Sequence, residues 1–100
     1  MSAQPVGGVE IRDCPDDGRY ELLVDGELAG FAQYRDRAGR RIFVHTEVDR
    51  RFAGRGLGTR LAAGVLDDVR ARGMRFIPRC PFIRGFVERH PEYLAPTTES

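Results

Sequence analysis

The segment DRRFAGRGLGT, residues 49–59, decides how the chain is organised, because the period of the hydrophobic pattern changes there. Before it, apolar and polar residues alternate as they do in β-strands. After it, apolar residues recur every three or four positions from Leu57 to Val69, as on one face of a helix. Three alternating glycines, Gly54, Gly56 and Gly58, join the two parts. We therefore predict a strand, a tight turn and a long helix around this segment.

The glycine turn also has the features of an anion-binding site. Glycines let the backbone approach a ligand closely, and the first N–H groups of a helix lack intrahelical acceptors and lie at the positive end of its dipole. Arg50, Arg51 and Arg55 add charge that suits phosphate. Thr59 would either contribute to phosphate binding or cap the helix. A tight corner between a strand and a helix would explain the glycines equally well.

Two common nucleotide-binding motifs do not fit this turn. A P-loop ends in Gly-Lys-Ser/Thr, and this chain contains no lysine. A dinucleotide-binding fingerprint needs a glycine three positions after Gly56, where this chain has Thr59. That fingerprint also follows the first strand of a βαβ unit, whereas this turn follows several strands.

Four strands are expected before the turn: Val9 to Asp13, Arg19 to Val24, Leu28 to Arg35 and Arg40 to Val48. Asp25-Gly26 is typical of a two-residue hairpin, and residues 36–39 form a polar turn. In the fourth strand, strict alternation places Ile42, Val44, Thr46 and Val48 on one face and Phe43, His45 and Glu47 on the other.

After the turn, the pattern predicts a helix that ends near Gly73, which suits a C-cap. A short strand follows over Met74 to Arg79, with Pro78 favouring a sheet edge or a bulge. A second helix, roughly Phe82 to Arg89, stops before Pro91. The fold class is therefore α+β, with an antiparallel meander followed by a helix, a strand and a helix.

Size and composition indicate a single globular domain over residues 1–100, with residues 1–7 and 96–100 flexible. The net charge of +1 gives no support for a nucleic-acid or membrane partner. Cys14 and Cys80 do not form a disulfide framework or a zinc-binding pattern. We expect a reduced, cytoplasmic protein without a metal.

Three segments make the chain resemble the GCN5-related N-acetyltransferase family, and in particular its short single-domain branch, the GCN5-like or YjdJ-like acetyltransferases. They are residues 45–48, residues 54–58 with Leu61, and the Pro-Arg-Cys-Pro-Phe segment at 78–82 running to 90–93. The family's turn is written Arg/Gln-x-x-Gly-x-Gly/Ala. In the usual register Ala53 stands where Arg or Gln is expected, a mild departure because most phosphate contacts in such folds come from backbone N–H groups.

The resemblance implies a mixed sheet of about five strands in which the fifth strand splays from the fourth, and a binding site for acetyl-CoA or coenzyme A. Its pantetheine arm would pair with Glu47 and Val48, and its pyrophosphate would lie on the turn. The cofactor-binding residues implied there are Gly54, Arg55, Gly56, Leu57, Gly58 and Thr59. The Cys14–Gly18 turn leaves no room for the helices that larger relatives carry, so the acceptor side should be open.

Two residues are candidates for catalysis. Cys80 would protonate the departing thiolate or attack the thioester, or would simply be a buried apolar residue. His45 would act as the base, oriented by Glu47, or would bind the acceptor, or would be a structural histidine. Cys14 and His90 are expected to have no functional role.

The leading hypothesis is an N-acetyltransferase that transfers an acetyl group from acetyl-CoA to an amine, on a protein or peptide, as a monomer or weak dimer. The alternative is a module that binds coenzyme A with little or no turnover.

Overall fold

A computed structural model describes residues 8–94. The termini at 1–7 and 96–100, which the sequence predicts to be flexible, lie outside the described residues. The elements in chain order are β1 (Val9–Cys14), β2 (Arg19–Val24), β3 (Glu27–Arg37), β4 (Arg40–Val48), α1 (Leu57–Ala71), β5 (Arg75–Pro78) and α2 (Pro81–Arg89). Short 3-10 turns occur at Pro15–Asp17, Arg50–Phe52 and Pro91–Tyr93.

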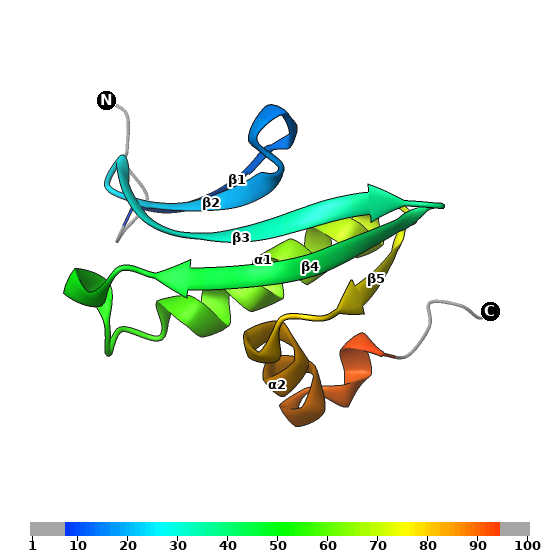
Figure 1. Cartoon of the computed structure of the whole chain (residues 1–100). Coiled ribbons are helices and arrows are strands. Elements are labelled where there is room, and N and C mark those ends of the chain that lie inside the picture. Colours follow the sequence, from blue (N-terminus) through cyan, green and yellow to red (C-terminus); the bar gives the residue numbers. More distant parts are fainter. Residues whose placement is uncertain (1–7, 95–100) are drawn as a thin grey trace.

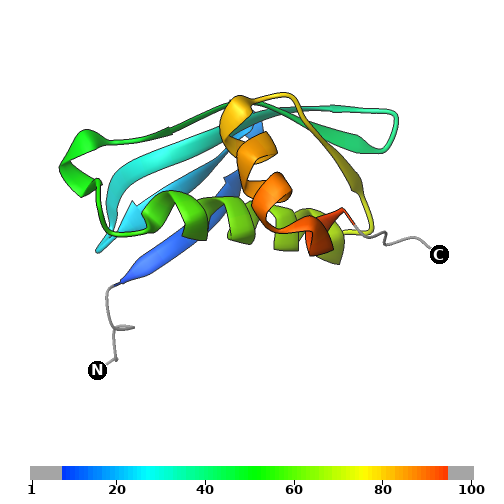
Figure 2. The ribbon, with the colours of Figure 1, turned by 90° about the horizontal axis from the view of Figure 1, so that it is seen from below.

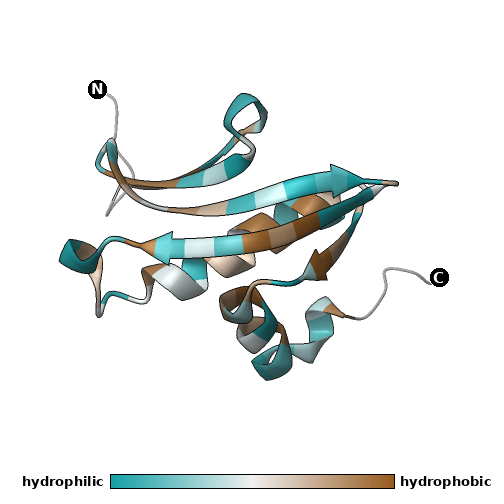
Figure 3. Ribbon diagram, viewed as in Figure 1, coloured by the Kyte–Doolittle hydropathy of each residue, from teal (hydrophilic) through white to brown (hydrophobic). Residues whose placement is uncertain are grey.

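The five strands form one mixed sheet in sequence order, and both helices cover the same face of it (Figures 1 and 2). The β1 to β4 pairs are antiparallel, and β5 is parallel to β4. Residues of both helices and of the inner sheet face share one hydrophobic core. Apolar colouring continues from β4 to β5 where the two strands pair (Figure 3). The α+β class and the five-stranded mixed sheet are confirmed.

Two tight hairpins give the meander its register. Asp25 and Gly26 both have positive φ, 52° and 83°, as the predicted two-residue turn requires. Ala38 and Gly39 make a second such turn, with φ of 52° and 77°. The prediction of a turn over residues 36–39 is therefore too long, because β3 continues to Arg37 and pairs there with Arg40.

Helix α1 ends as predicted at a left-handed glycine. Gly73 has φ of 70°, its N–H bonds to the Arg70 carbonyl, and the N–H of Met74 bonds to the Val69 carbonyl. This pair of hydrogen bonds satisfies carbonyl groups that the last helical turn would otherwise leave free.

A buried polar cluster, which sequence reasoning missed, connects the last turns of α1 to the sheet. Its centre is Arg41, only 5% exposed, whose guanidinium contacts Asp36 at 2.8 Å, Tyr20 at 2.8 Å and Asp13 at 3.3 Å. Tyr20 in turn donates to Asp68 of α1. Burial and the bond to Asp68 raise the pKa of Tyr20 well above its usual range. The members of this polar cluster are Asp13, Tyr20, Tyr34, Asp36, Arg41, Asp68 and Arg72.

Candidate functional site

Strand β5 diverges from β4, and within residues 8–94 no strand pairs with this edge of β4 over residues 44–48; this unpaired edge is the cleft. The two strands pair only over residues 40–43 and 75–78, and the last bond between the segments runs from the Cys80 N–H to the Phe43 carbonyl at 2.9 Å. Beyond it β4 continues to Val48, while the chain after β5 turns into α2 (Figure 1). Among the described residues, no strand other than those of the meander pairs with the second half of β4.

A β-bulge at Val44 lies at the start of this free half of β4. Tyr34 pairs with Phe43 and Gln33 pairs with His45, so that Val44 is the extra residue. The sequence prediction that Ile42, Val44, Thr46 and Val48 share one face is therefore wrong, because an extra residue reverses the alternation.

The side chains of β4 are arranged differently on either side of this bulge. Phe43 and Thr46 lie opposite Tyr34 and Ala32 in the register, on the helix-covered face. Since alternation resumes after Val44, Ile42, His45 and Glu47 lie on the open face.

The alternating direction of the backbone hydrogen bonds along β4 shows which of its N–H and C=O groups face the cleft. The Asp49 N–H bonds to the Ala29 carbonyl in β3. Because bonding direction alternates along an antiparallel strand, Glu47 and His45 face β3, whereas Val48 and Thr46 face the cleft. The Val48 backbone is thus free of bonds to β3, and its proposed role in cofactor binding stays a prediction. The Glu47 backbone is directed away from the cleft, and Thr46 is a cleft residue that sequence reasoning missed.

The glycine turn brings the chain from β4 into α1 with two left-handed residues. Gly54 and Gly56 have φ of 81° and 71°, values that favour glycine. Asp49 accepts a hydrogen bond from the Arg51 N–H at 2.9 Å and so fixes the entry to the turn. A Cβ on Gly58 would lie 2.7 Å from Cζ of Phe82, so a glycine here allows α2 to pack closely on the first turn of α1.

The first turn of α1 offers free N–H groups. Its N-cap is Gly56, which has no side chain to cap the helix, and no acidic residue lies in the first turn. The earliest bond within the helix joins the Arg60 N–H to the Gly56 carbonyl. Thr59 is exposed and does not cap the helix, so the capping interpretation of this residue is wrong. Free N–H groups and the positive end of the helix dipole are features that suit an anion.

Of the three arginines near the turn, one is already engaged. Arg51 pairs with Glu27 at 2.9 Å and with Asp49 at 3.4 Å. Arg55 lies over the ring of Phe52, and within residues 8–94 neither Arg55 nor Arg50 has an ion-pair partner. Arg50 and Arg55 therefore have charge available for an anion at the helix N-terminus.

Cys80 lies at the closed end of the cleft. It is 1% exposed, and its sulfur accepts the N–H of Ile83 at 3.4 Å, which makes it the N-cap of α2. The sulfur also lies 3.2 Å from the hydroxyl of Thr46. The Thr46–Cys80 contact spans the gap between β4 and the start of α2.

His45 is 51% exposed on the open face, and its Nε2 lies 2.8 Å from the Glu47 carboxylate, the pairing that the sequence predicts. Its ring also packs near Phe31. Because Cys80 belongs to the core under the other face, the structure does not bring these two candidate catalytic residues together.

Other polar residues considered from sequence have structural contacts. The ring of His90 stacks on Phe86 at the end of α2, with centroids 4.4 Å apart. Cys14 is half-buried at the end of β1, where its thiol donates to the Arg12 carbonyl.

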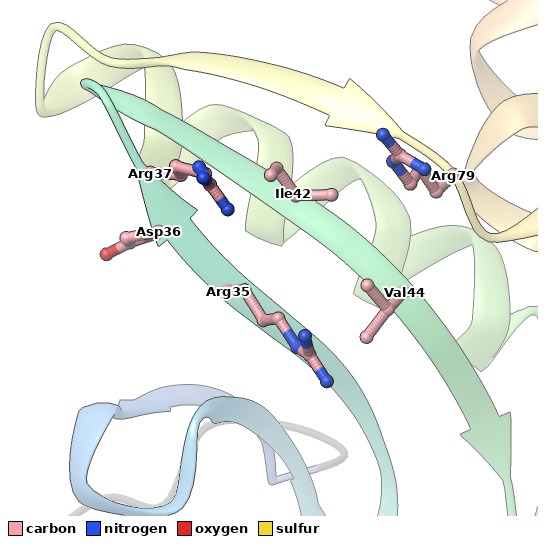
Figure 4. A pocket seen from close by; sticks show the side chains of 6 residues that line it. All are labelled: Arg35, Asp36, Arg37, Ile42, Val44 and Arg79. Atoms are coloured by element: carbon pink, nitrogen blue, oxygen red, sulfur yellow. The ribbon is translucent and has the colours of Figure 1, made fainter.

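A pocket of about 440 Å³ lies on the open face beside the closed end of the cleft (Figure 4). Ile42 and Val44 of β4 form its apolar part. The remaining lining residues are Arg35, Asp36, Arg37 and Arg79. No helix covers this face in the part of the chain that the structure describes, since only a 3-10 turn at Pro15–Asp17 joins β1 to β2.

Comparisons with known proteins agree with this geometry. A family model described as GCN5-related N-acetyl-transferase matches residues 19–96. A GCN5-like protein from Staphylococcus aureus has a similar structure, with a TM-score of 0.65 and 21% identity over 94% of this chain and 87% of that one. A ribosomal-protein-alanine N-acetyltransferase from Brucella melitensis biovar Abortus 2308 has a TM-score of 0.55 and 19% identity over 82% of this chain and 65% of that one.

At these identities the two solved structures show the fold alone. No curated protein sequence matches the chain. The family model is a stronger result, since it covers most of the chain, including β4, the glycine turn, α1 and the segment around Cys80. The chain therefore belongs to the GCN5-related N-acetyltransferase family.

Proposed function

We propose that the protein transfers an acetyl group from acetyl-CoA to an amine. One observation carries the proposal: the free edge of β4 leads directly to the free N–H groups of α1. Such an edge can bind an amide-rich chain as an added strand would, and the helix N-terminus suits a pyrophosphate. Coenzyme A has an amide-rich arm and a pyrophosphate next to each other.

The residues that would hold acetyl-CoA follow from their positions. The backbone of Val48, and of Thr46 in place of Glu47, would pair with the pantetheine arm. The pyrophosphate would be bound by the turn, with Arg55 supplying charge at its rim. The turn residues are Gly54, Arg55, Gly56, Leu57, Gly58 and Thr59.

Acetyl-CoA supplies an activated acetyl group: the amine nitrogen bonds to the thioester carbon, the carbon–sulfur bond breaks, and the sulfur leaves with the electron pair. A lysine-like amine, with a reference pKa of about 10.4, must first lose a proton. We assign that role to His45, whose imidazole is exposed on the open face and oriented by Glu47. The Thr46–Cys80 pair lies at the cleft end and can return a proton to the departing thiolate.

A second function, binding of coenzyme A without turnover, is favoured by one observation. Cys80 is buried, caps α2 and contacts Thr46. Its sulfur therefore makes structural contacts and is little accessible to a substrate. If His45 is also dispensable, the protein would be a binding module.

Calorimetric titration with acetyl-CoA, followed by release of free coenzyme A with a mixture of amines, distinguishes these functions. We compare wild type with Cys80→Ser, Cys80→Ala and His45→Ala. An enzyme should bind acetyl-CoA in all four forms and lose at least about tenfold in rate in His45→Ala, as expected for a general base. Cys80→Ser, which keeps a hydroxyl donor, should exceed Cys80→Ala.

Binding with equal background rates in all forms would favour the binding module. The absence of any heat or melting shift with millimolar coenzyme A would overturn both functions. Intact mass after incubation with acetyl-CoA tests the remaining route, since a gain of about 42 Da lost in Cys80→Ala would reveal an acetyl-cysteine.

A further inference from the structure

The open-face pocket beside the cleft combines an apolar floor with three exposed guanidinium groups. Arg35 and Arg37 belong to β3, and Arg79 follows β5, so the three arginines approach from both sides of β4. In Figure 4 they surround Ile42 and Val44 and do not converge on one point. The pocket is thus basic at several separate positions around an apolar centre.

The positive charge of this pocket is not neutralised by the protein. The carboxylate among the lining residues, Asp36, gives both oxygens to Arg41 at 2.8 Å. Throughout residues 8–94, neither Arg35, Arg37 nor Arg79 takes part in an ion pair. A guanidinium group can bind a carboxylate through two parallel hydrogen bonds. Because these three arginines have no such partner within residues 8–94, they are available for an external anion.

The pocket adjoins the place where the acetyl group would lie. The bond between Phe43 and Cys80 closes the cleft. Val44, which follows Phe43, and Arg79, which precedes Cys80, line the pocket. The phosphates of coenzyme A belong at the other end of β4, at the glycine turn that follows Val48. The three arginines are therefore placed to contact the acceptor and not the acetyl donor.

Building on the proposed function, we infer that the acceptor amine is carried on an acidic peptide, whose carboxylates bind Arg35, Arg37 and Arg79. Spaced guanidinium groups match several carboxylates along a peptide better than they match one phosphate group. The volume of about 440 Å³ lies within the range of ligand pockets and accommodates one or two residues beside the amine. The apolar floor of Ile42 and Val44 would contact the aliphatic part of the amine-bearing side chain.

The test compares two peptides with the same single amine, one flanked by Asp and Glu and the other by Asn and Gln. Variants Arg35→Gln, Arg79→Gln and the double variant are compared with Arg12→Gln, which removes the same charge from the remote strand β1. We expect about tenfold higher kcat/KM for the acidic peptide, from two or three charge-assisted contacts, declining as salt rises. Each pocket variant should raise KM for that peptide about threefold, and the double variant about tenfold.

Anisotropy with a labelled acidic peptide whose amine is blocked separates this inference from the proposed enzyme. Peptide binding that weakens in the pocket variants, without acetyl-CoA binding or turnover, would support the pocket and reject the enzyme. Acetyl transfer that is equal for both peptides would overturn the pocket inference alone. So would equal losses in Arg12→Gln, or tighter binding of a phosphorylated peptide than of the acidic one.

Discussion

The two ends of helix α1 differ in whether their polar groups have hydrogen-bond partners within the protein. At its C-terminal end, the polar cluster connects Asp68 and Arg72 to Tyr20, Arg41 and Asp13 of the sheet. At its N-terminal end, the N-cap is a glycine and the first turn has no acidic residue. One end satisfies its polar groups within the protein, and the other leaves N–H groups free.

This difference separates stability from function within one helix. Buried polar groups without partners cost free energy, so proteins pair nearly all of them. Free groups persist where they face solvent and a ligand can bind. Substitutions at the C-terminal end should therefore change the free energy of unfolding, and substitutions at the N-terminal end should change binding of acetyl-CoA.

The largest expected effect is that of Arg41→Met. It keeps the apolar part of the side chain but leaves Asp13 and Asp36 without their shared cation, a loss of about 3 kcal/mol in the free energy of unfolding. Urea denaturation measures it. The control is Arg40→Met, the exposed neighbour on the other face of β4, which should change stability by less than about 0.5 kcal/mol. Equal effects would show that the polar cluster is not the stabilising element.

Thr59→Glu should change stability and binding in opposite directions. A carboxylate in the first turn of α1 interacts favourably with the helix dipole, which stabilises by about 0.5 kcal/mol. The same charge repels a pyrophosphate at that helix end and should weaken acetyl-CoA binding at least about tenfold. Thr59→Gln is the uncharged control. Unchanged affinity in Thr59→Glu, measured by calorimetry, would mean that phosphates do not bind at this turn.

Sequence periodicity was sufficient for most of the fold. Alternation identified the strands, the Asp25-Gly26 pair identified a hairpin, and Gly73 identified the end of α1, because each of these is determined by local backbone preferences. The bulge at Val44 could not be predicted, since it depends on pairing with β3. Without the bulge, the sequence pattern assigned Thr46 and Val48 to the same sheet face as Ile42 and Val44.

The sequence was a weaker guide to the site. It identified the glycine turn between β4 and α1 as a tight turn, but it could not show that Cys80 is a buried helix cap or that His45 lies on the other sheet face. Both facts arise from contacts between distant segments. The pocket arginines carried no signal, because arginine occurs all along this chain.

Gly58→Ala tests how closely α2 is packed against the N-terminal end of α1. The new Cβ would lie 2.7 Å from the Phe82 ring, which is 39% exposed and free to turn outward. The helix propensity of alanine, worth about 1 kcal/mol over glycine, offsets that movement, so stability should hardly change. The displaced ring should disturb the packing around the acetyl-CoA site and weaken acetyl-CoA binding about threefold. Adding Phe82→Leu should restore affinity if the ring is the cause.

The smallest expected effect is on how the free energy of unfolding falls at acid pH (the acid limb), and it concerns Asp68 near the C-terminal end of α1. Burial alone would raise the pKa of Asp68, but hydrogen bonds from Tyr20 and Arg72 outweigh it and hold that pKa below its ordinary value. A carboxyl whose pKa is lower in the folded state stabilises above its unfolded pKa, about 3.9, and loses that contribution as pH falls through the folded value.

Asp68→Asn should therefore reduce stability at pH 7 and flatten its decline below about pH 4. The neighbouring Asp67→Asn is the control, because Asp67 is exposed and lies outside the polar cluster. If both variants retained the wild-type acid limb in denaturation at several pH values, Asp36, whose pKa is lowered chiefly by its hydrogen bonds to Arg41, would be the carboxylate that determines it.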